Sequence, residues 1–394
     1  MGACFPNSRR AQMKILLVSS GSGSRGGGEI FLDYLGEGLA ERGHEVLMWI
    51  PAHQRMDELA QRVSRFARVI RADYCSVYDY RTRTIATALN WRTSHRIAEQ
   101  WRELRPDVIH LNKQNLEDGL DLLRAADQCT IPNVCTIHLT QTARYLGARI
   151  ASLRDWIARN ALKSYSGILV AVQETRGAAL RKFLDGKTNT RAILNGVPIP
   201  DLNDVNVVRM AKRRELNIGD ADMLVLGVGR LVEQKRPDLF LKIASEIYQH
   251  LPASKFVWIG DGNFASRWDE WVKREGLAAV ISRVGWQSEV NSFLFAGDLL
   301  LHVARYEGLP LAVAEAMAAK LACAVTRDLA QELPLLDENN VLFVDDLPRL
   351  LKKLEDPTTL KAIAAQARAL AEKELSIGKM VKSYERVYTD ASKT

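Results

Sequence analysis

Short apolar runs alternate along the chain with segments of helical periodicity, and this alternation constrains the fold more than any other feature. The helical segment at 27–43 is typical, with apolar residues at helical spacing and Gly43 at its end. Alternation of this kind predicts a parallel sheet covered by helices on both faces. The strand-sized runs of the first half are KILLVSS (14–20), HEVLMWI (44–50), DVIHL (107–111), NVCTIH (133–138), GILVAV (167–172) and TRAIL (190–194).

The segment NGVPIPDLNDVN (195–206) interrupts this pattern with Asn-Gly and two prolines, so we interpret it as a linker. The pattern then restarts, and a length of 394 residues also favours two domains. We therefore expect an α/β protein with two doubly wound, Rossmann-like domains facing a central cleft. The strands expected in the second half are 222–230, 255–260, 280–284, 298–303 and 323–326, with helices at 238–249 and 357–393.

The expected boundaries follow from these elements. The N-terminal Rossmann-like domain is expected to cover 13–200, and the C-terminal one 201–376. A C-terminal helix at 377–394 is expected to cross back to the first domain. Residues 1–12 lack the apolar stretch of a signal peptide and are predicted to be a disordered extension.

Composition narrows the function classes. A net charge of +7 indicates an anionic partner, either nucleic acid, a membrane surface or a phosphorylated substrate. Nucleic acid is disfavoured because no base-stacking aromatic residues stand among the arginines. Five cysteines without a C-x-x-C motif argue against a disulfide framework or a zinc site and fit a cytoplasmic protein. No apolar run approaches the roughly 20 residues that span a bilayer.

A glycine-rich loop follows the first strand. Gly21, Gly23 and Gly26 form a literal G-x-G-x-x-G, which would suit an NAD(P)-dependent oxidoreductase. That function needs an acid at the end of the second strand, but this strand ends in Ile50-Pro51. The other interpretations are a flexible loop, or a loop whose N–H groups approach a phosphate or sugar.

Three motifs stand at strand ends in the second half. In GVGRLVEQKRPD (227–238), Arg230 and Lys235 lie just before a helix that Pro237 can open, a good site for a diphosphate. The motif IGDGN (259–263) is by itself a turn signal. The motif RVGWQSEV (283–290), in which a strand ends at Gly285, either contacts the flat base of a nucleotide or is simply a turn.

The run RYEGLPLAVAEAMAAK (305–320) carries two acids in an apolar context. Pro310 suits a first helical turn, so we expect a helix from about Leu309, with Glu307 at the loop entry and Glu315 more than a turn inside. Carboxylates accept hydrogen bonds from pairs of hydroxyls, which suits a ribose or a polyol. Alternatively, Glu307 is a helix-capping acid and Glu315 pairs with a buried arginine.

These motifs, taken in order, resemble the retaining GT-B glycosyltransferases of family 4. Glu307 and Glu315 match the E-x7-E arrangement of that family. The segments GGGEIFLDYLGEGLAERGHEV, NGV, GRLVEQKRPD, GDG and SIGKMVKSYERVY also resemble it, and together they cover the chain from about Met13 to its end. Two departures stand out, since Lys320 replaces a usual glycine and Leu139 replaces a usual Asp after His138.

The resemblance implies that the N-terminal domain (13–200) binds the acceptor and the C-terminal domain (201–376) binds the nucleotide-sugar donor. It also implies a role for each motif. Arg230 and Lys235 would hold the donor diphosphate, Glu315 the ribose and Glu307 the transferred sugar. His138 would contact that sugar, Gly27 and Gly28 would close on donor and acceptor, and the segment Val284, Gly285 and Trp286 would face the base. The remaining expected donor-binding residues are Gly262, Gly308, Leu309, Pro310 and Leu311.

The implied reaction is a metal-independent transfer that retains the anomeric configuration. We expect no cofactor, a nucleoside-diphosphate sugar as donor (a UDP-sugar first, GDP-mannose second), and a glycan or lipid-linked acceptor in cell-surface polysaccharide, lipopolysaccharide or glycolipid synthesis. The alternatives are a soluble small-molecule glycosyltransferase, the oxidoreductase above, and a catalytically idle scaffold.

The first domain is rich in arginine, which suggests an anionic membrane surface as a further partner and a peripheral location at the inner face of the membrane. Arg62, Arg65 and Arg68 recur every third residue and would form a basic stripe on a helix. The segment 144–163 has the pattern of an interfacial basic helix, or of an ordinary amphipathic helix with a solvated basic face. The arginines concerned in the first stretch are Arg62, Arg65, Arg68, Arg71, Arg81, Arg83, Arg92, Arg96, Arg102 and Arg105.

Overall fold

The computed structural model describes residues 12–80, 82, 84–186 and 189–393. The predicted N-terminal extension therefore lies outside the described residues, except for Gln12. The chain divides into two compact units. Unit 1 consists of residues 1–193 together with 380–394, and unit 2 consists of residues 194–379. Among the described residues, each helix is either too short or too polar to cross a membrane.

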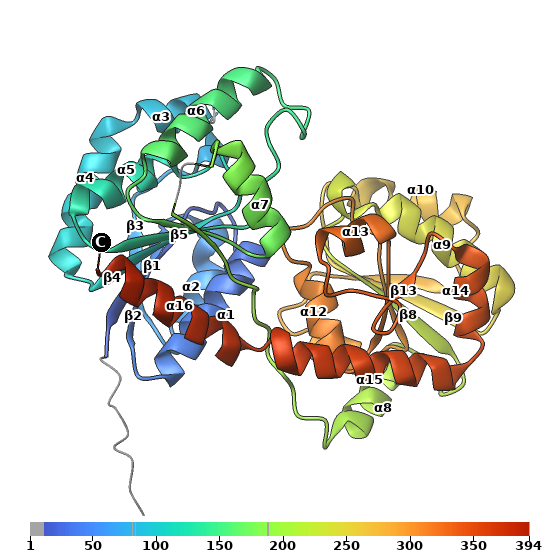
Figure 1. Ribbon diagram of the computed structural model, residues 1–394. Coiled ribbons are helices and arrows are strands. Elements are labelled where there is room, and N and C mark those ends of the chain that lie inside the picture. Colours follow the sequence, from blue (N-terminus) through green and yellow to red (C-terminus); the bar gives the residue numbers. More distant parts are fainter. Residues whose placement is uncertain (1–11, 81, 83, 187–188, 394) are drawn as a thin grey trace, which may run out of the picture. The chain divides into compact units, whose positions relative to one another are not determined.

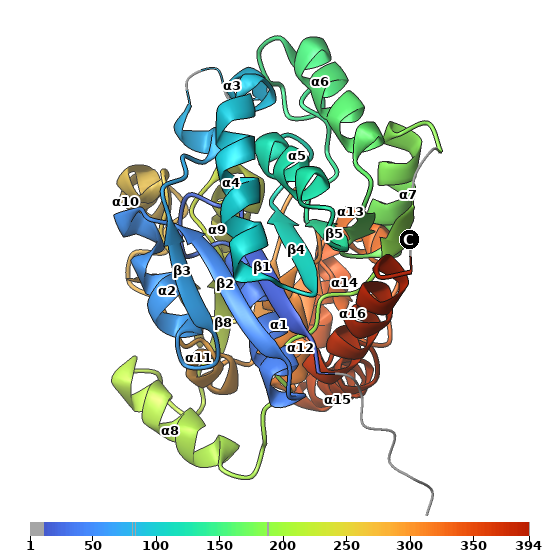
Figure 2. The ribbon, with the colours of Figure 1, turned by 90° about the vertical axis from the view of Figure 1, so that its left-hand side faces the viewer.

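The described strands of unit 1 form one parallel sheet in the order β3-β2-β1-β4-β5-β6-β7. Figure 2 shows β3, β2, β1, β4 and β5 side by side in this order. The direction of strand addition reverses between β1 and β4, and ligands of such sheets bind at the strand ends beside this switch point. The strands are β1 (Lys14–Ser19), β2 (Glu45–Pro51), β3 (Arg68–Ala72), β4 (Val108–Lys113), β5 (Asn133–Ile137), β6 (Ile168–Ala171) and β7 (Thr190–Ala192).

Helices cover both faces of this sheet (Figure 1). The last helix, α16, is built into unit 1, because the hydroxyls of Tyr384 and Tyr388 bond to Thr136 and His110 at 2.8 and 2.7 Å. The helices are α1 (Gly27–Glu41), α2 (Asp57–Val63), α3 (Thr84–Leu89), α4 (Trp91–Leu104), α5 (Leu120–Cys129), α6 (Ala151–Ser164), α7 (Glu174–Phe183) and α16 (Ile377–Ala391).

Unit 2 repeats the same connectivity. Its described strands are also parallel and follow the order β10-β9-β8-β11-β12-β13, with the switch point between β8 and β11. The strands are β8 (Met223–Val228), β9 (Ser254–Ile259), β10 (Ile281–Gly285), β11 (Leu299–His302), β12 (Ala322–Val325) and β13 (Leu342–Phe343).

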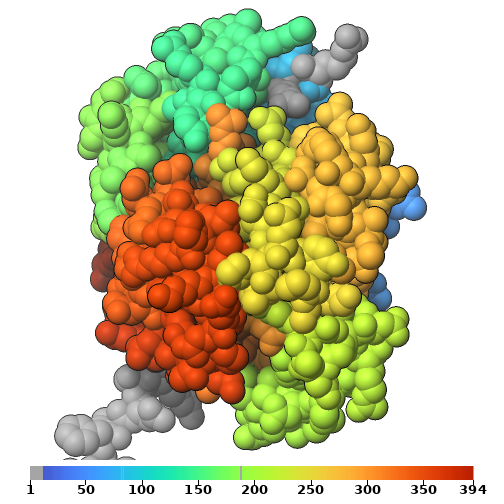
Figure 3. Space-filling view, turned by 90° about the vertical axis from the view of Figure 1, so that its right-hand side faces the viewer, coloured from blue at the N-terminus to red at the C-terminus, as the bar shows by residue number. Residues whose placement is uncertain are grey.

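The helices of unit 2 pack on both faces of its sheet. Figure 3 shows α9 in yellow, α10 in amber and α14 and α15 in red-orange on one side of the unit. The helices are α8 (Val205–Glu215), α9 (Pro237–His250), α10 (Ala265–Arg274), α11 (Asn291–Ala296), α12 (Leu311–Ala318), α13 (Arg327–Glu332), α14 (Leu347–Leu354) and α15 (Pro357–Glu374).

The eleven strands predicted from the sequence are all present, with bounds that differ by at most two residues. The continuous helix predicted over 357–393 is wrong, because Leu375 and Ser376 separate α15 from α16. At this break the N–H of Val197 donates to the carbonyl of Leu375 at 2.7 Å. The predicted linker is extended around Val197 but already enters α8 at Val205.

The predicted helical stripe of Arg62, Arg65 and Arg68 is wrong. The α2 helix ends at Val63, and Arg68 begins strand β3. Arg62 and Arg65 both pair with Asp33 of α1, at 3.3 and 3.1 Å. These positive charges are therefore compensated by acids that stand about 30 residues earlier in the chain. Arg81 and Arg83 lie outside the described residues.

The predicted helix at 144–163 begins later than expected, with α6 starting at Ala151. An ordinary amphipathic helix would expose its basic side chains and bury its apolar ones, but α6 does not follow this rule. Leu153 and Trp156 are exposed, whereas Arg154 is largely buried and pairs with Glu117 at 2.7 Å.

Candidate functional site

The candidate donor residues of unit 2 lie along one edge of its sheet. Strands β10, β9, β8 and β11 are neighbours, and because they are parallel their carboxyl ends meet at the same edge. From β10 to β11, the residues at or just beyond these ends are Val284, Gly285, Trp286, Gly262, Arg230, Lys235, Glu307, Gly308, Leu309 and Pro310. Leu311 and Glu315 follow in α12. The structure thus gathers motifs that the sequence spreads over about 85 positions.

Two of these residues bind each other across the switch point. Lys235 ends a 3₁₀ turn after β8, and its Nζ donates to Oε1 of Glu307 in the loop after β11. The imidazole of His302, at the end of β11, faces the same carboxylate, with Nε2 3.3 Å from Oε1.

The electrostatics of Glu307 reflect these neighbours. Burial alone would raise the pKa of its carboxyl, but the Lys235 ammonium and the facing His302 lower the pKa to about 2. Burial in turn lowers the pKa of His302 below its ordinary value, although Glu307 acts in the opposite direction. At neutral pH the centre of the edge therefore holds an ammonium, a carboxylate and a neutral imidazole.

This pair leaves binding capacity for a ligand. An ammonium has three N–H donors, so Lys235 can hold Glu307 and a phosphate oxygen at the same time. A carboxylate has two oxygens with about four acceptor positions, so Glu307 can also accept sugar hydroxyls. Glu307 is not a capping residue of α12, because Pro310 occupies the N-cap position.

The N-terminus of α12 opens onto the same edge. The helix begins at Leu311, two residues later than the sequence suggested. The first N–H groups of a helix have no intrahelical partner and favour an anion. Glu315 is half-buried at the start of the second turn.

Lys320 follows the C-terminal end of α12 and stands where the family resemblance predicts a glycine. Its φ is 60°, a left-handed conformation that glycine adopts at no steric cost.

The glycines of this edge mainly permit close backbone packing. A Cβ on Gly262 would lie 2.5 Å from the carbonyl oxygen of Leu231, so this loop packs directly on the loop after β8. Gly285 has a φ of 70°, and its carbonyl accepts from the N–H of Gly260 at 2.7 Å. These contacts hold three strand ends together, while Trp286 is half-buried beside them.

The candidate residues of unit 1 lie at the corresponding edge of its own sheet. Gly27 and Gly28 begin α1 after β1, and His138 follows β5. Between them stands Asn112 of β4, whose Oδ1 lies 2.7 Å from Nε2 of His138 and whose Nδ2 donates to the carbonyl of Gly28 at 3.1 Å. A Cβ on Gly28 would collide with the amide of Gln114.

The glycine-rich loop encloses a carboxylate of its own chain. The side chain of Glu29 is buried at the start of α1 and accepts from Nε2 of Gln114 at 2.8 Å. A Cβ on either Gly21 or Gly26 would collide with this carboxylate. The place where a dinucleotide would put its pyrophosphate in a Rossmann fold is thus already taken by an acidic side chain, which argues against the oxidoreductase hypothesis.

His138 is a neutral residue in this environment. Burial lowers the pKa of His138 to about 3. The pKa of His110 is also lowered to about 3, mainly by burial and in addition by the neighbouring His138. His138 can therefore exchange a hydrogen bond with a ligand, but it carries no charge at neutral pH.

These two histidines predict an acid-sensitive unit 1. Their folded-state pKa values lie below the ordinary 6.5, so the unfolded state binds more protons and stability falls as pH falls from 6.5 toward 3. Between pH 7 and pH 5 we expect a loss of about 2 kcal/mol per histidine in the free energy of unfolding. Calorimetric unfolding at both pH values measures it. Replacing the exposed His95 by Gln should leave this dependence unchanged, and equal stability at both pH values would contradict the prediction.

Sequence reasoning missed His302, Asn112, Gln114 and Glu29. The available signal was a polar residue that ends or follows a buried strand, as His302 ends the apolar run DLLLH and Asn112 follows DVIHL. Because parallel strands end at one edge, such residues converge there.

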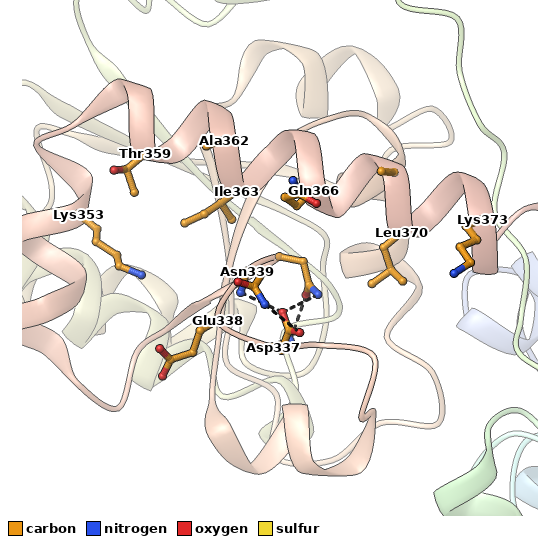
Figure 4. Close-up of a pocket in the computed structure, with 12 residues that line it drawn as sticks. Asp337, Glu338, Asn339, Lys353, Thr359, Ala362, Ile363, Gln366, Leu370 and Lys373 are labelled. Carbon is orange, nitrogen blue, oxygen red and sulfur yellow. Dashed lines mark hydrogen bonds between the residues drawn. The ribbon is translucent and has the colours of Figure 1, made fainter.

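A surface groove of ≈ 680 Å³ lies elsewhere on unit 2, between α15 and residues 337–340 (Figure 4). The loop precedes β13, so it stands at the amino ends of the strands, opposite the candidate edge. Asp337 there accepts hydrogen bonds from the side chains of Asn339 and Asn340.

Within the described part of the chain, no group of three or more His, Cys, Asp or Glu residues is placed to hold a metal ion.

Comparison with known protein families gives the class of this molecule. The model for glycosyltransferase family 4 matches residues 25–199, and the model for glycosyl transferases group 1 matches residues 208–345. The two matches follow each other along most of the chain, and the chain belongs to the family 4 glycosyltransferases of GT-B fold. The oxidoreductase hypothesis is therefore wrong.

Individual relatives agree with this assignment. The chain is 24% identical to the UDP-Gal:alpha-D-GlcNAc-diphosphoundecaprenol alpha-1,3-galactosyltransferase of Escherichia coli, over 69% of this chain and 68% of that protein. It is also 24% identical to the alpha-monoglucosyldiacylglycerol synthase of Acholeplasma laidlawii, over 75% and 78%. The structure of Anabaena HepE with UDP and glucose shares the fold, with a TM-score of 0.76, 17% identity and coverage of 96% and 100%.

Proposed function

We propose that this glycosyltransferase transfers a hexosyl group from a UDP-sugar to a hydroxyl of a lipid-linked acceptor, with retention of the anomeric configuration and without a metal ion. The observation that carries the proposal is the Lys235–Glu307 pair, which stands at the switch point of unit 2 beside the N-terminus of α12. This arrangement combines a cation for phosphate with a carboxylate for hydroxyls. GDP-mannose is the second candidate donor.

In this proposal, different residues bind different parts of the donor. Lys235 and Arg230, with the N-terminal N–H groups of α12, hold the diphosphate. Glu315 accepts the ribose hydroxyls, and Glu307 accepts hydroxyls of the sugar. Val284, Gly285 and Trp286 lie beside the uracil, and His138 and the loop at Gly27 and Gly28 contact sugar and acceptor.

The proposed chemistry is a front-face substitution. The bond between C1 of the sugar and the phosphate oxygen breaks, and a bond between C1 and the acceptor oxygen forms on the same face. The acceptor proton passes to the departing phosphate oxygen. Catalysis then consists of positioning and of stabilising the charge that develops on the leaving diphosphate, which is the work assigned to Lys235 and Arg230.

Two observations support the donor and acceptor classes. HepE binds UDP and glucose, and the Escherichia coli relative takes UDP-Gal, which favours a UDP-sugar. The Escherichia coli relative is named for a diphosphoundecaprenol-linked acceptor and the Acholeplasma laidlawii relative for a diacylglycerol-linked product, which supports a lipid-linked acceptor here.

A donor and acceptor panel tests the proposal. The protein is incubated in excess EDTA with UDP- or GDP-sugars and with polyprenyl-diphosphate, diacylglycerol or water-soluble sugar acceptors. We expect turnover with a UDP-sugar and a lipid acceptor, and NMR of the product should show the anomeric configuration of the donor. Turnover only after addition of Mg²⁺ or Mn²⁺, inversion, or transfer only to the soluble sugars would contradict the corresponding part of the proposal.

A further inference from the structure

Exposed apolar side chains are unevenly distributed over the described residues. Ten large hydrophobic side chains are exposed there, and eight of them stand between Tyr78 and Trp156 of unit 1. Five stand within twelve residues, 145–156, in the connection from β5 to α6 and in the first turns of that helix. We call this stretch the apolar ridge, and it consists of Tyr145, Leu146, Ile150, Leu153 and Trp156.

The ridge points away from the core of unit 1. Ile150 is 60% exposed and Trp156 62% exposed, whereas Ala158 and Leu162 on the other side of α6 are buried. In Figures 1 and 2, α6 lies on the outside of unit 1. The neighbouring helix α3 adds the exposed Leu89 at its end. Large apolar side chains that are exposed together in one segment point to an interaction site.

The loop under the ridge is held in place by hydrogen bonds. The N–H groups of Ala143 and Arg144 donate to the carboxylate of Asp155, at 2.7 and 3.2 Å. Arg144 also donates to the hydroxyl of Ser152 at 2.7 Å. Asp155 is the one acid between Leu139 and Lys163, and it is turned inward, so the ridge carries no outward carboxylate of its own segment.

The charges around the ridge are positive. Residues 139–163 contain five basic side chains and one acid, Asp155. Arg154 pairs with Glu117, and Arg159 and Lys163 pair with Asp185, so three acids stand against the five positive charges. A surplus of two positive charges remains, and Arg144 and Arg149 are exposed beside the apolar side chains. Exposed Trp, Tyr and aliphatic residues next to arginines are typical of segments that lie in the interface of an anionic membrane.

The position of the ridge in the fold fits such a surface. Residues 139–150 directly follow His138 at the carboxyl end of β5, so the ridge starts from the same sheet edge as the candidate site of unit 1. A lipid-linked acceptor presents its reactive headgroup at the membrane surface. Docking through the ridge would bring this edge to the headgroup layer.

We propose that the apolar ridge docks the protein on the surface of an anionic lipid membrane, with its apolar side chains in the interface and Arg144 and Arg149 at the lipid phosphates. This inference rests on the proposed lipid-linked acceptor for its biological purpose. The docking itself is a property of unit 1 and is measured without any reaction.

Vesicle sedimentation tests the inference. Wild-type protein should bind vesicles of equal parts phosphatidylglycerol and phosphatidylcholine, more weakly when salt is raised. The variant Leu153→Ser/Trp156→Ser should lose at least about tenfold in partition coefficient, and Arg144→Glu/Arg149→Glu should lose the preference for anionic over neutral vesicles. The matched control is Val207→Ser/Met210→Ser, which removes two exposed side chains of α8 in unit 2 and should bind like wild type.

Three outcomes would overturn the docking proposal. These are wild-type protein that fails to bind anionic vesicles at low salt, a ridge variant that binds like wild type, and a dimer in light scattering that disappears in the ridge variant, which would assign the ridge to a second copy. Transfer to the lipid-linked acceptor dissolved in detergent is measured in parallel. If transfer in detergent persists while vesicle binding fails, the docking inference is wrong and the proposed function stands. If the wild-type protein shows neither vesicle binding nor transfer, both the docking inference and the proposed function are contradicted.

Discussion

The Lys235→Ala variant is expected to lose about two orders of magnitude in kcat/KM. The ammonium of Lys235 is the proposed partner of the leaving diphosphate, and a charge-assisted contact of this kind contributes about 1.5–3 kcal/mol. Because the charge on the diphosphate grows in the transition state, kcat should fall more than the affinity for donor. Steady-state kinetics measure both, and Lys242→Ala, which removes an exposed lysine of α9, is the matched control.

The same substitution should also destabilise unit 2. It leaves the buried Glu307 carboxylate without its cation, and breaking a buried pair costs on the order of 3 kcal/mol. The double variant Lys235→Ala/Glu307→Gln should recover much of this stability, because no unpaired buried charge remains, but it should not recover activity. Wild-type kcat/KM in Lys235→Ala would contradict the assignment, and recovery of activity in the double variant would show that Lys235 matters only for stability.

The second large effect is expected at the two acids of the E-x7-E pair. Glu307→Gln should abolish most turnover but keep binding of UDP, because its proposed ligand is the sugar. Glu315→Gln should weaken the binding of UDP itself, by about tenfold for one lost charge-assisted contact to the ribose. Titration calorimetry with UDP, together with turnover of the UDP-sugar, separates the two roles.

The structure adds a condition to this comparison. Glu307 holds Lys235, so Glu307→Gln also changes the position of the ammonium, and a moderate loss of UDP affinity is compatible with the account. The exposed Glu270 of α10 offers the control variant Glu270→Gln. If Glu315→Gln binds UDP like wild type while Glu307→Gln does not bind it, the two roles are assigned the wrong way round.

Eleven of the strands could be predicted because each is a compact apolar run between helical segments. Strands β3 and β13 were missed. The sequence of β3, RVIRA, has arginines at both exposed positions and only two large aliphatic residues, and β13 consists of Leu342 and Phe343 alone. The arginine stripe failed for a related reason. Spacing of three suggested a helix. Arg62 does have a local partner in Glu58, but Arg62 and Arg65 also pair with Asp33 of α1, and that contact between distant segments is not revealed by a local pattern.

The candidate site shows the same division. Strand-end motifs identified the residues, because parallel strands place their ends at one edge regardless of the distance in sequence. The sequence did not show that Lys235 and Glu307 bind each other across 72 positions, nor that His302 faces them. Glu29 stands in the segment GGGEIFLDYLGEGLAERGHEV, but its burial beneath Gly21 and Gly26 depends on the backbone path of the loop.

The central claim is that a nucleoside-diphosphate sugar binds at the carboxyl edge of β8 and β11 in unit 2, and a crystal structure with UDP tests it most directly. The account predicts the diphosphate beside Lys235 and Arg230 at the N-terminus of α12, the ribose hydroxyls on Glu315 and the uracil near Trp286. UDP against the glycine-rich loop at Gly21–Gly26, or in the groove between α15 and residues 337–340, would contradict it.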